Sequence, residues 1–299
     1  MMRILVSGSS GFIGASLVPS LERSGYQVVR LMRSQPQSGE AAIQWDPAAG
    51  MLRAEQLEGC DAVVHLAGEN IVGRWTQQQK AKIRESRVRG TDLLAQMLAR
   101  CSRPPRVLVS ASATGYYGDR GDVPLHEDSF AGIGFLSDVC REWEAATAPA
   151  ASKGIRVVHV RLGLVLSPQG GALAKMLLPF RLGLGGIIGH GRQYWSWVTI
   201  RDVLGAIRHA ITTDALHGAV NVTAPQPVTN REFTTVLGRL LRRPTICPVP
   251  AFGVRLLFGE MADALLLSST RVKPKRLLDT GYVFQDADLE SALHHLLPR

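Results

Sequence analysis

The amino-acid sequence predicts an α/β fold in which a doubly wound parallel sheet is joined by a smaller C-terminal lobe. Two observations lead to this prediction. Apolar segments rich in Val, Ile and Leu alternate with segments of helical spacing, and a glycine-rich turn follows the first apolar segment. Near-continuous apolar strands are typical of parallel sheets, because helices cover both faces. Strands that alternate with helices favour right-handed crossovers between parallel neighbours.

The elements of this sheet can be assigned in chain order. The predicted strands are Ile4–Ser7, Gln27–Leu31, Ala42–Trp45, Asp61–Leu66, Arg106–Ser110 and Arg156–Val165. The predicted helices between them are Gly14–Arg23, Gln77–Arg100 and Leu136–Ser152, and a further helix and strand follow at Asp202–Ile211 and Ala219–Val222. We therefore assign residues 1–165 and 199–224 to the sheet domain. Residues 166–198 and 225–299, which are rich in glycine, proline and short helical patterns, form the smaller lobe.

The composition excludes several classes of protein. The chain has 299 residues, of which 45% are hydrophobic and 20% charged, and this is ordinary for a globular protein. No apolar run approaches the roughly 20 residues of a spanning helix, and the N-terminus does not resemble a signal peptide. We therefore expect a cytoplasmic protein without a membrane partner. The four cysteines form no C-x-x-C pair, so no metal site is indicated and reduced thiols are expected.

The net charge of +9 suits either a nucleic acid or a phosphate-bearing small molecule. The basic residues are spread along the chain, and the densest group, at 74–89, lacks an interleaved aromatic stacking pattern. We therefore expect no nucleic-acid partner.

The glycine-rich turn is Gly8-Ser9-Ser10-Gly11-Phe12-Ile13-Gly14. It lies directly after the first strand and opens the first helix. In that position glycines permit a tight turn and the close approach of a pyrophosphate, and the helix N-terminus offers free N–H groups. The turn predicts a dinucleotide-binding fold of the Rossmann type, with all seven residues at the cofactor.

The end of the second strand indicates which dinucleotide is bound. An NAD site usually has an acidic residue about 20 residues past the glycines, where it binds the ribose 2′-hydroxyl. Here Arg33 and Ser34 lie at that point, and the first acid afterwards is Glu40. A guanidinium can bind a 2′-phosphate, so NADP(H) is favoured over NAD.

The remaining cofactor contacts are expected at the carboxyl ends of the next strands. Small residues after the fourth strand let a dinucleotide lie against the backbone, and Glu69 and Asn70 are polar residues at the same edge. The predicted contacts beyond the turn, Arg33 and Ser34 are Leu66, Ala67, Gly68, Glu69, Arg87, Ser110, Ala111 and Leu162.

Several separated motifs carry a resemblance to a known family. They are the glycine turn, Asp61–Gly68, Gly68–Ile71 with Arg74–Thr76, Ser112–Gly118, Cys140–Glu144, Arg161–Val165 and the segment from Val249 to Pro274. With them the chain resembles the extended branch of the short-chain dehydrogenase/reductase superfamily, and within it the atypical "epimerase family" proteins that carry a C-terminal domain of unknown function. The resemblance implies an NAD(P)-binding sheet of strand order 3-2-1-4-5-6 and a C-terminal lobe that closes over a substrate.

Most of the superfamily's catalytic groups are absent. The superfamily uses a Tyr-x-x-x-Lys pair with a Ser or Thr and an Asn; the tyrosine transfers a proton, and the lysine lowers its pKa and holds the ribose. Here Leu136 and Cys140 stand at the tyrosine and lysine positions, and Arg87 replaces the asparagine. A leucine transfers no proton, and a thiol carries no fixed positive charge. The candidate catalytic residues are therefore Ser112, the surviving serine, and Tyr116, on the loop after the fifth strand.

Three functions follow as hypotheses. The first is an NADP(H)-dependent oxidoreductase that acts on an unidentified small molecule. The second is a protein that binds or senses NADP(H) without turnover, which the loss of the Tyr-Lys pair favours. The third is a nucleotide-sugar epimerase, which is disfavoured because such enzymes rely on the missing tyrosine.

Overall fold

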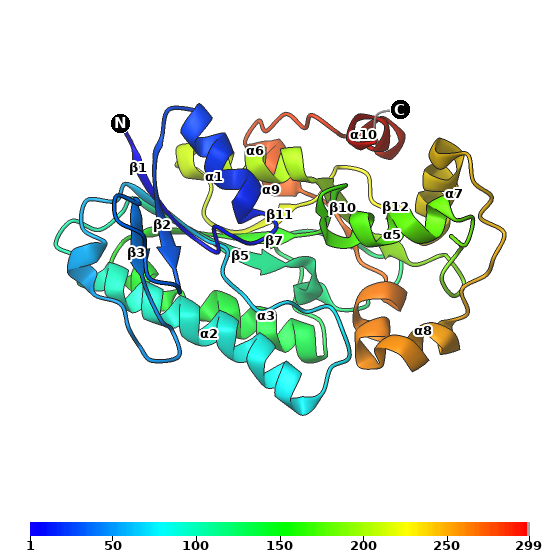
Figure 1. Ribbon diagram of the computed structural model, residues 1–299, viewed down its shortest axis with the longest axis horizontal. Helices are drawn as coiled ribbons and strands as arrows, with labels where there is room; N and C mark the ends of the chain where they lie inside the picture. The colour runs from blue at the N-terminus through cyan, green and yellow to red at the C-terminus, as the bar shows by residue number, and fades with distance from the viewer. Residues whose placement is uncertain (298–299) are drawn as a thin grey trace.

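The computed structural model describes residues 1–297 and contains a central sheet of seven parallel strands (Figure 1). The strand order is β3-β2-β1-β4-β5-β7-β11, and every neighbouring pair is parallel. The strands are β1 (Arg3–Ser7), β2 (Gln27–Met32), β3 (Ala42–Gln44), β4 (Ala62–His65), β5 (Val107–Ala113), β7 (Arg156–Leu162) and β11 (Gly218–Val222). The predicted Rossmann fold and the order 3-2-1-4-5-6 are confirmed, and β11 adds a seventh strand. The order reverses between β1 and β4, which is where such sheets bind ligands.

Helices cover both faces of the sheet, as Figure 1 shows. One face packs on α1 (Gly14–Arg23), α6 (Ile200–Thr212) and the short α9 (Lys275–Asp279). The other packs on α2 (Gln77–Arg100), α3 (Phe135–Ala145) and α4 (Ala148–Ser152). Short 3-10 turns at Ala54–Gln56 and Thr114–Tyr117 complete the domain. The four residues of β4 are all buried, as expected for a strand with helices on both sides.

The predicted strand Arg156–Val165 is in fact two strands. After β7 the chain bends at Gly163 and continues as β8 (Leu164–Ser167), which pairs with β10 (Trp197–Thr199) outside the main sheet. The Gly163 amide still donates to Val222 in β11, whereas the Leu164 amide donates to Ser196 at 2.7 Å. A Cβ atom at residue 163 would overlap the Ser196 carbonyl oxygen, so only glycine fits this corner.

The predicted helix Leu136–Ser152 is also divided, into α3 and α4. Thr147 precedes α4, and its hydroxyl donates to the Glu144 carbonyl. Pro149, in the first turn of α4, has no N–H to donate to the preceding turn, so one continuous helix would lose a hydrogen bond there.

A further apolar cluster lies outside those on the two faces of the sheet. This cluster is built from α5 (Gly171–Arg181), α7 (Asn230–Leu241), α10 (Leu289–Leu296), the strands β8 and β10, and the pair β9 (Tyr194–Trp195) and β12 (Val228–Thr229). Trp197 is fully buried in it. The division into 166–198 and 225–299 stays a prediction, although these segments supply most of the cluster.

The C-terminal segment connects the lobe to the sheet domain. It contains α8 (Ala251–Phe258), a π-helix at Ala262–Leu267 and β13 (Arg271–Val272). β13 pairs in parallel with β6 (Pro124–Leu125), which follows β5. Within residues 1–297, none of the helices combines the length and apolar character needed to cross a membrane.

Candidate functional site

The glycine turn lies at the carboxyl end of β1, and two of its glycines are required by packing. Gly8 has a positive φ of 68°, and a Cβ atom there would lie 2.7 Å from the Leu66 carbonyl carbon. A Cβ atom on Gly14 would overlap the carbonyl oxygen of Gly8. These glycines therefore let the turn pass closely over the end of β4 and let α1 begin directly above it.

Gly11 differs from these two glycines because it borders open space. Only the Gly8 carbonyl oxygen, at 3.2 Å, would approach a Cβ atom at this position. Among residues 1–297, no hydrogen bond takes up the amides of Ser9, Ser10, Phe12 or Ile13. Free amides at the start of a helix attract anions, so the turn is suited to a pyrophosphate.

The side chains of Phe12 and Ile13 have packing roles. Ile13 packs against the apolar cluster under α1, and the Phe12 ring lies against Gly170 and Gly171 at the start of α5. Phe12 therefore links the glycine turn to the smaller lobe. Only the backbone of these two residues is available for a phosphate.

Arg33 and Ser34 lie exposed just after β2. Glu40 is 3.9 Å from Arg30, to which it pairs, and in the part of the chain that the structure describes Arg33 forms no ion pair. The Arg33 guanidinium is therefore free to bind an anionic group next to the turn.

The loop after β4 holds Leu66, Ala67, Gly68 and Glu69 beneath the glycine turn. The Leu66 amide donates to the Ser7 carbonyl at 3.2 Å, and the Glu69 amide donates to the Ser86 hydroxyl at 3.0 Å. His65, at the end of β4, is fully buried between the Ser7 and Thr91 hydroxyls. Burial lowers the pKa of His65 to about 4, so it is a neutral packing residue at pH 7.

Arg87 projects from α2 over this loop. Its Nη1 donates to the carbonyl oxygens of Glu69 at 3.0 Å and Ile83 at 3.2 Å. Its guanidinium lies 5.1 Å from the centre of the Trp143 ring. A Cβ atom on Gly68 would lie 3.3 to 3.5 Å from the guanidinium atoms, so the two residues are in direct contact.

Cys140, at the family's lysine position, is buried in α3 with its thiol toward the Ala113 carbonyl at 3.8 Å. Burial raises the pKa of this thiol to about 11, and the nearby Glu144 carboxylate adds to the rise. The thiol is therefore protonated at pH 7 and is a weak nucleophile.

Three predicted cofactor residues lie in the strands themselves. Ser110 is fully buried in β5, and its hydroxyl has no partner among the described residues; the neighbouring Ala111 is also buried. Leu162, at the end of β7, is partly buried against the core under α1 and α6. Their contact with a cofactor stays a prediction.

Ser112 belongs to a buried polar network that the sequence did not predict. Its hydroxyl donates to the Glu144 carboxylate at 2.7 Å. Arg161 donates to the same carboxylate through Nε at 2.8 Å and Nη2 at 2.9 Å, and it also donates to the Tyr117 hydroxyl. Tyr117 in turn donates to Asn221 in β11 at 2.7 Å. The Ser112 hydrogen is thus already engaged, and a catalytic role for it stays a prediction that requires this bond to break.

The same network shifts the pKa values of two of its members. Burial raises the pKa of Tyr117 to about 12, although Arg161 opposes the change. Burial by itself lowers the pKa of Arg161, but its hydrogen bonds to Glu144 and Tyr117 raise it overall. The arginine therefore stays charged and the tyrosine neutral. The motifs containing Glu144 and Arg161 were visible in the sequence, but their pairing was not.

Tyr116 is the partly exposed neighbour of this network. The Arg161 guanidinium carbon lies 3.4 Å from the centre of its ring, and no hydrogen bond within residues 1–297 involves its hydroxyl. Leu136 packs against the preceding residue, Gly115, where a Cβ atom would lie 3.3 Å from the Leu136 Cβ. Tyr116 therefore directly follows the residue that contacts Leu136, which stands at the tyrosine position of the Tyr-x-x-x-Lys pattern.

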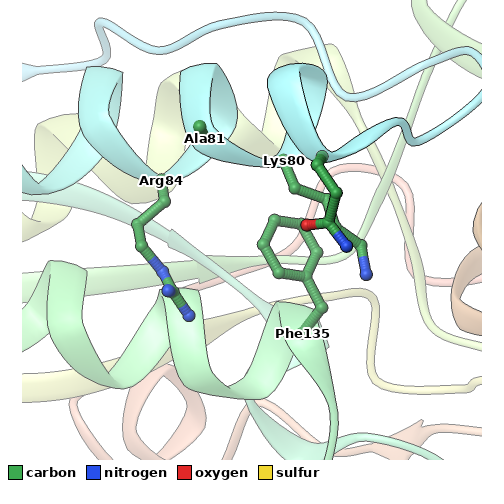
Figure 2. A pocket seen from close by; sticks show the side chains of 5 residues that line it. Lys80, Ala81, Arg84 and Phe135 are labelled. Carbon is green, nitrogen blue, oxygen red and sulfur yellow. The ribbon is translucent and has the colours of Figure 1, made fainter.

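Two hollows in the surface are lined by residues outside the glycine turn. One, of about 270 Å³, lies between α2 and α3, where Lys80 and Arg84 approach the Phe135 ring (Figure 2). Glu260 and Glu142 neutralise these two cations. The other, of about 550 Å³, lies between the loop 119–122 and the segment 190–194 of the lobe.

Comparisons with known proteins agree with this geometry. Residues 4–223 match the NAD dependent epimerase/dehydratase family, and residues 249–296 match a domain of unknown function, DUF1731. An epimerase family protein of Mycobacterium tuberculosis is 41% identical, over 99% of this chain and 98% of its own length.

Two solved structures are similar over nearly the whole chain. The crystal structure of human epimerase family protein SDR39U1 (isoform 2) with NADPH has a TM-score of 0.90 and 37% identity, and 99% of each chain is covered. A nucleoside-diphosphate sugar epimerase from Corynebacterium glutamicum has a TM-score of 0.83 and 35% identity, and the match covers 99% of this chain and 58% of that one.

Proposed function

The chain belongs to the NAD dependent epimerase/dehydratase family, and we propose that it binds NADP(H) across the carboxyl edge of its sheet and transfers a hydride to or from a small molecule. The observation that carries the proposal is the pairing of a glycine turn with Arg33. Within residues 1–297, four amides of the turn donate to no acceptor and Arg33 forms no ion pair. The human relative that was crystallised with NADPH supports it.

Each part of the cofactor has a matching group in this chain. The amides of the turn face the pyrophosphate, and the start of α1 adds the positive end of its dipole. Arg33 and Ser34 bind the 2′-phosphate, since a charge-assisted contact discriminates strongly between a phosphate and a hydroxyl. The nicotinamide half lies over the loop Leu66–Glu69.

The chemistry requires a proton donor near the hydride acceptor, and Tyr116 is the candidate. When bound, NADPH supplies the hydride. Within residues 1–297 no hydrogen bond engages the Tyr116 hydroxyl, and the Arg161 guanidinium carbon lies 3.4 Å from the centre of its ring. Leu136 has no proton to give, and burial holds the Cys140 thiol protonated.

One observation favours a second candidate, which is NADP(H) binding without turnover. The Ser112 hydroxyl donates to Glu144, so the one catalytic group kept from the superfamily pattern is already engaged. The similarity to the nucleoside-diphosphate sugar epimerase supports a third, epimerisation of a nucleotide sugar.

Cofactor choice is tested by titration of the purified protein with NADPH and NADH. The wild type should bind NADPH more tightly, and Arg33→Gln should remove most of the preference. A charge-assisted hydrogen bond contributes about 1.5–3 kcal/mol, which is about 10- to 150-fold in Kd. Arg30→Gln is the matched control, because Arg30 pairs with Glu40 and should leave the preference unchanged. Equal affinities for the two dinucleotides in the wild type would contradict the proposal.

Turnover is tested by following NADPH absorbance with a panel of ketones, aldehydes and nucleotide sugars. If NADPH is oxidised by the wild type but not by Tyr116→Phe, and both bind NADPH equally well, the result supports the oxidoreductase function. Tight NADPH binding without turnover on any of them supports the binding protein, and interconversion of nucleotide sugars without net NADPH loss supports the epimerase.

A further inference from the structure

Among residues 1–297 the Arg87 guanidinium forms no ion pair within 4 Å, although the charge of Glu69 acts on it from farther away. It is half-buried on α2, and none of the ion pairs in residues 1–297 includes it. Its two hydrogen bonds both leave from Nη1, toward the carbonyl oxygens of Glu69 and Ile83. Within the described chain, Nε and Nη2 have no acceptor.

This arrangement is costly unless a ligand completes it. Burial lowers the pKa of Arg87, which shows that its surroundings disfavour the charge, yet an arginine stays protonated in proteins. The Trp143 ring offers only partial compensation, at 5.1 Å from the guanidinium carbon. A buried charge is normally paired, so a group outside the chain is expected to accept from the free N–H groups.

The position of the guanidinium narrows the choice of that group. It contacts Gly68, beside the crevice where the sheet order reverses, and lies close enough to the Cys140 thiol to affect its pKa. Residue 140 is where the superfamily carries the lysine that holds the nicotinamide ribose. The residue at the lysine position on α3 is thus uncharged, and the cation near it comes from α2.

We propose that Arg87 takes over the lysine's binding role and donates from Nε and Nη2 to the two hydroxyls of the nicotinamide ribose. The planar fork of a guanidinium suits two adjacent oxygen acceptors. The inference rests on the proposed NADP(H) binding, and it assigns Arg87 to the nicotinamide half of the cofactor, as Arg33 is assigned to the adenosine half.

The two halves can be tested separately with NADPH and adenosine 2′,5′-bisphosphate, which carries the 2′-phosphate but no nicotinamide ribose. Arg87→Gln should weaken NADPH binding by about 10- to 150-fold and change binding of the fragment by less than about twofold. Arg87→Lys should restore part of the affinity. Arg33→Gln should weaken both ligands. Arg89→Gln, two residues away at an exposed position paired with Glu85, should change neither.

Two results would overturn the inference. They are an unchanged NADPH affinity in Arg87→Gln, and an equal loss for NADPH and the fragment. If the wild type binds neither ligand, the proposed function itself fails, so the two failures are distinguishable.

A second variant keeps the test valid if Arg87→Gln lowers the melting temperature. Gly68→Ala leaves the charge in place, but its Cβ atom would lie 3.3 Å from the guanidinium carbon and would shift the guanidinium by a few tenths of an ångström. NADPH should again weaken more than the fragment. Equal affinities of Gly68→Ala and the wild type for NADPH would refute the proposed contact.

Discussion

Replacing Glu144 by glutamine should destabilise the protein far more than the same change two residues earlier. Glu144 accepts two hydrogen bonds from Arg161 and one from Ser112, and the side chains of the ion pair are only 12% and 4% exposed. Glutamine keeps the shape but has one acceptor oxygen and an NH₂ group that would face an N–H of Arg161. The arginine would then remain as a buried cation without a counter-ion, held only by neutral acceptors such as the Tyr117 hydroxyl.

The size of the effect follows from this burial. Removing one partner of a buried ion pair costs about 3–5 kcal/mol. The entropy of unfolding is roughly 2.1 cal/mol/K per residue, or about 0.6 kcal/mol/K for a chain of 299 residues. The expected decrease in melting temperature is therefore about 5–8 °C, measured by differential scanning calorimetry.

Glu142→Gln is the matched control on the same helix. Glu142 lies 3.2 Å from Arg84, but both side chains are nearly half exposed, at 44% and 45%. An exposed pair contributes at most about 1 kcal/mol, so its loss should lower the melting temperature by less than about 2 °C. If Glu144→Gln melts no lower than Glu142→Gln, the buried network does not stabilise the fold as argued.

Three further predictions concern the turn, the thiols and His65. Gly11→Val should fold normally by circular dichroism and lose NADPH binding, because its side chain fills the space of the pyrophosphate. Gly14→Ala, by contrast, should be destabilised, because its Cβ atom overlaps the turn. NADPH binding by folded Gly11→Val would contradict this prediction. Iodoacetamide at pH 8 should modify the exposed Cys247 and leave Cys140 intact, since burial raises the pKa of Cys140 to about 11. Mass spectrometry of the labelled protein identifies the modified cysteines, and labelling of Cys140 in the folded protein would contradict the prediction. Burial lowers the pKa of His65 from 6.5 to about 4. As the pH falls, the unfolded chain therefore binds a proton on this histidine before the folded chain does. The free energy of unfolding should then decrease by about 3 kcal/mol between pH 6.5 and pH 4. His65→Gln should flatten that slope in urea unfolding, and an equally steep slope in the variant would rule out this assignment.

The sequence was sufficient where the structural signal is local. The turn at residues 8–14 follows a buried strand and opens a helix, and Gly8 adopts a positive φ there. Apolar segments buried on both faces predicted a parallel sheet, because each strand's surroundings are reflected in its own residues. The absence of an acid between Arg33 and Glu40 was likewise readable without coordinates.

The sequence was insufficient where a residue's role depends on a distant partner. The bend at Gly163 depends on the Ser196 carbonyl, so the segment 156–165 alone reads as one strand. Ser112 matched a catalytic pattern, but its hydroxyl is engaged by Glu144, 32 residues later in the chain.

Sequence by itself thus determined the class of fold, the place of the glycine-rich turn and the absence of the Tyr-Lys pair, since each depends on residue types at short spacing. Tertiary structure alone decided which charges are paired. Arg161 lies against Glu144, whereas Arg87 and Arg33 form no ion pair among residues 1–297. The physical reason is that a side chain's charge and hydrogen bonds are satisfied by whatever the fold brings within about 4 Å, and spacing along the chain does not specify those neighbours.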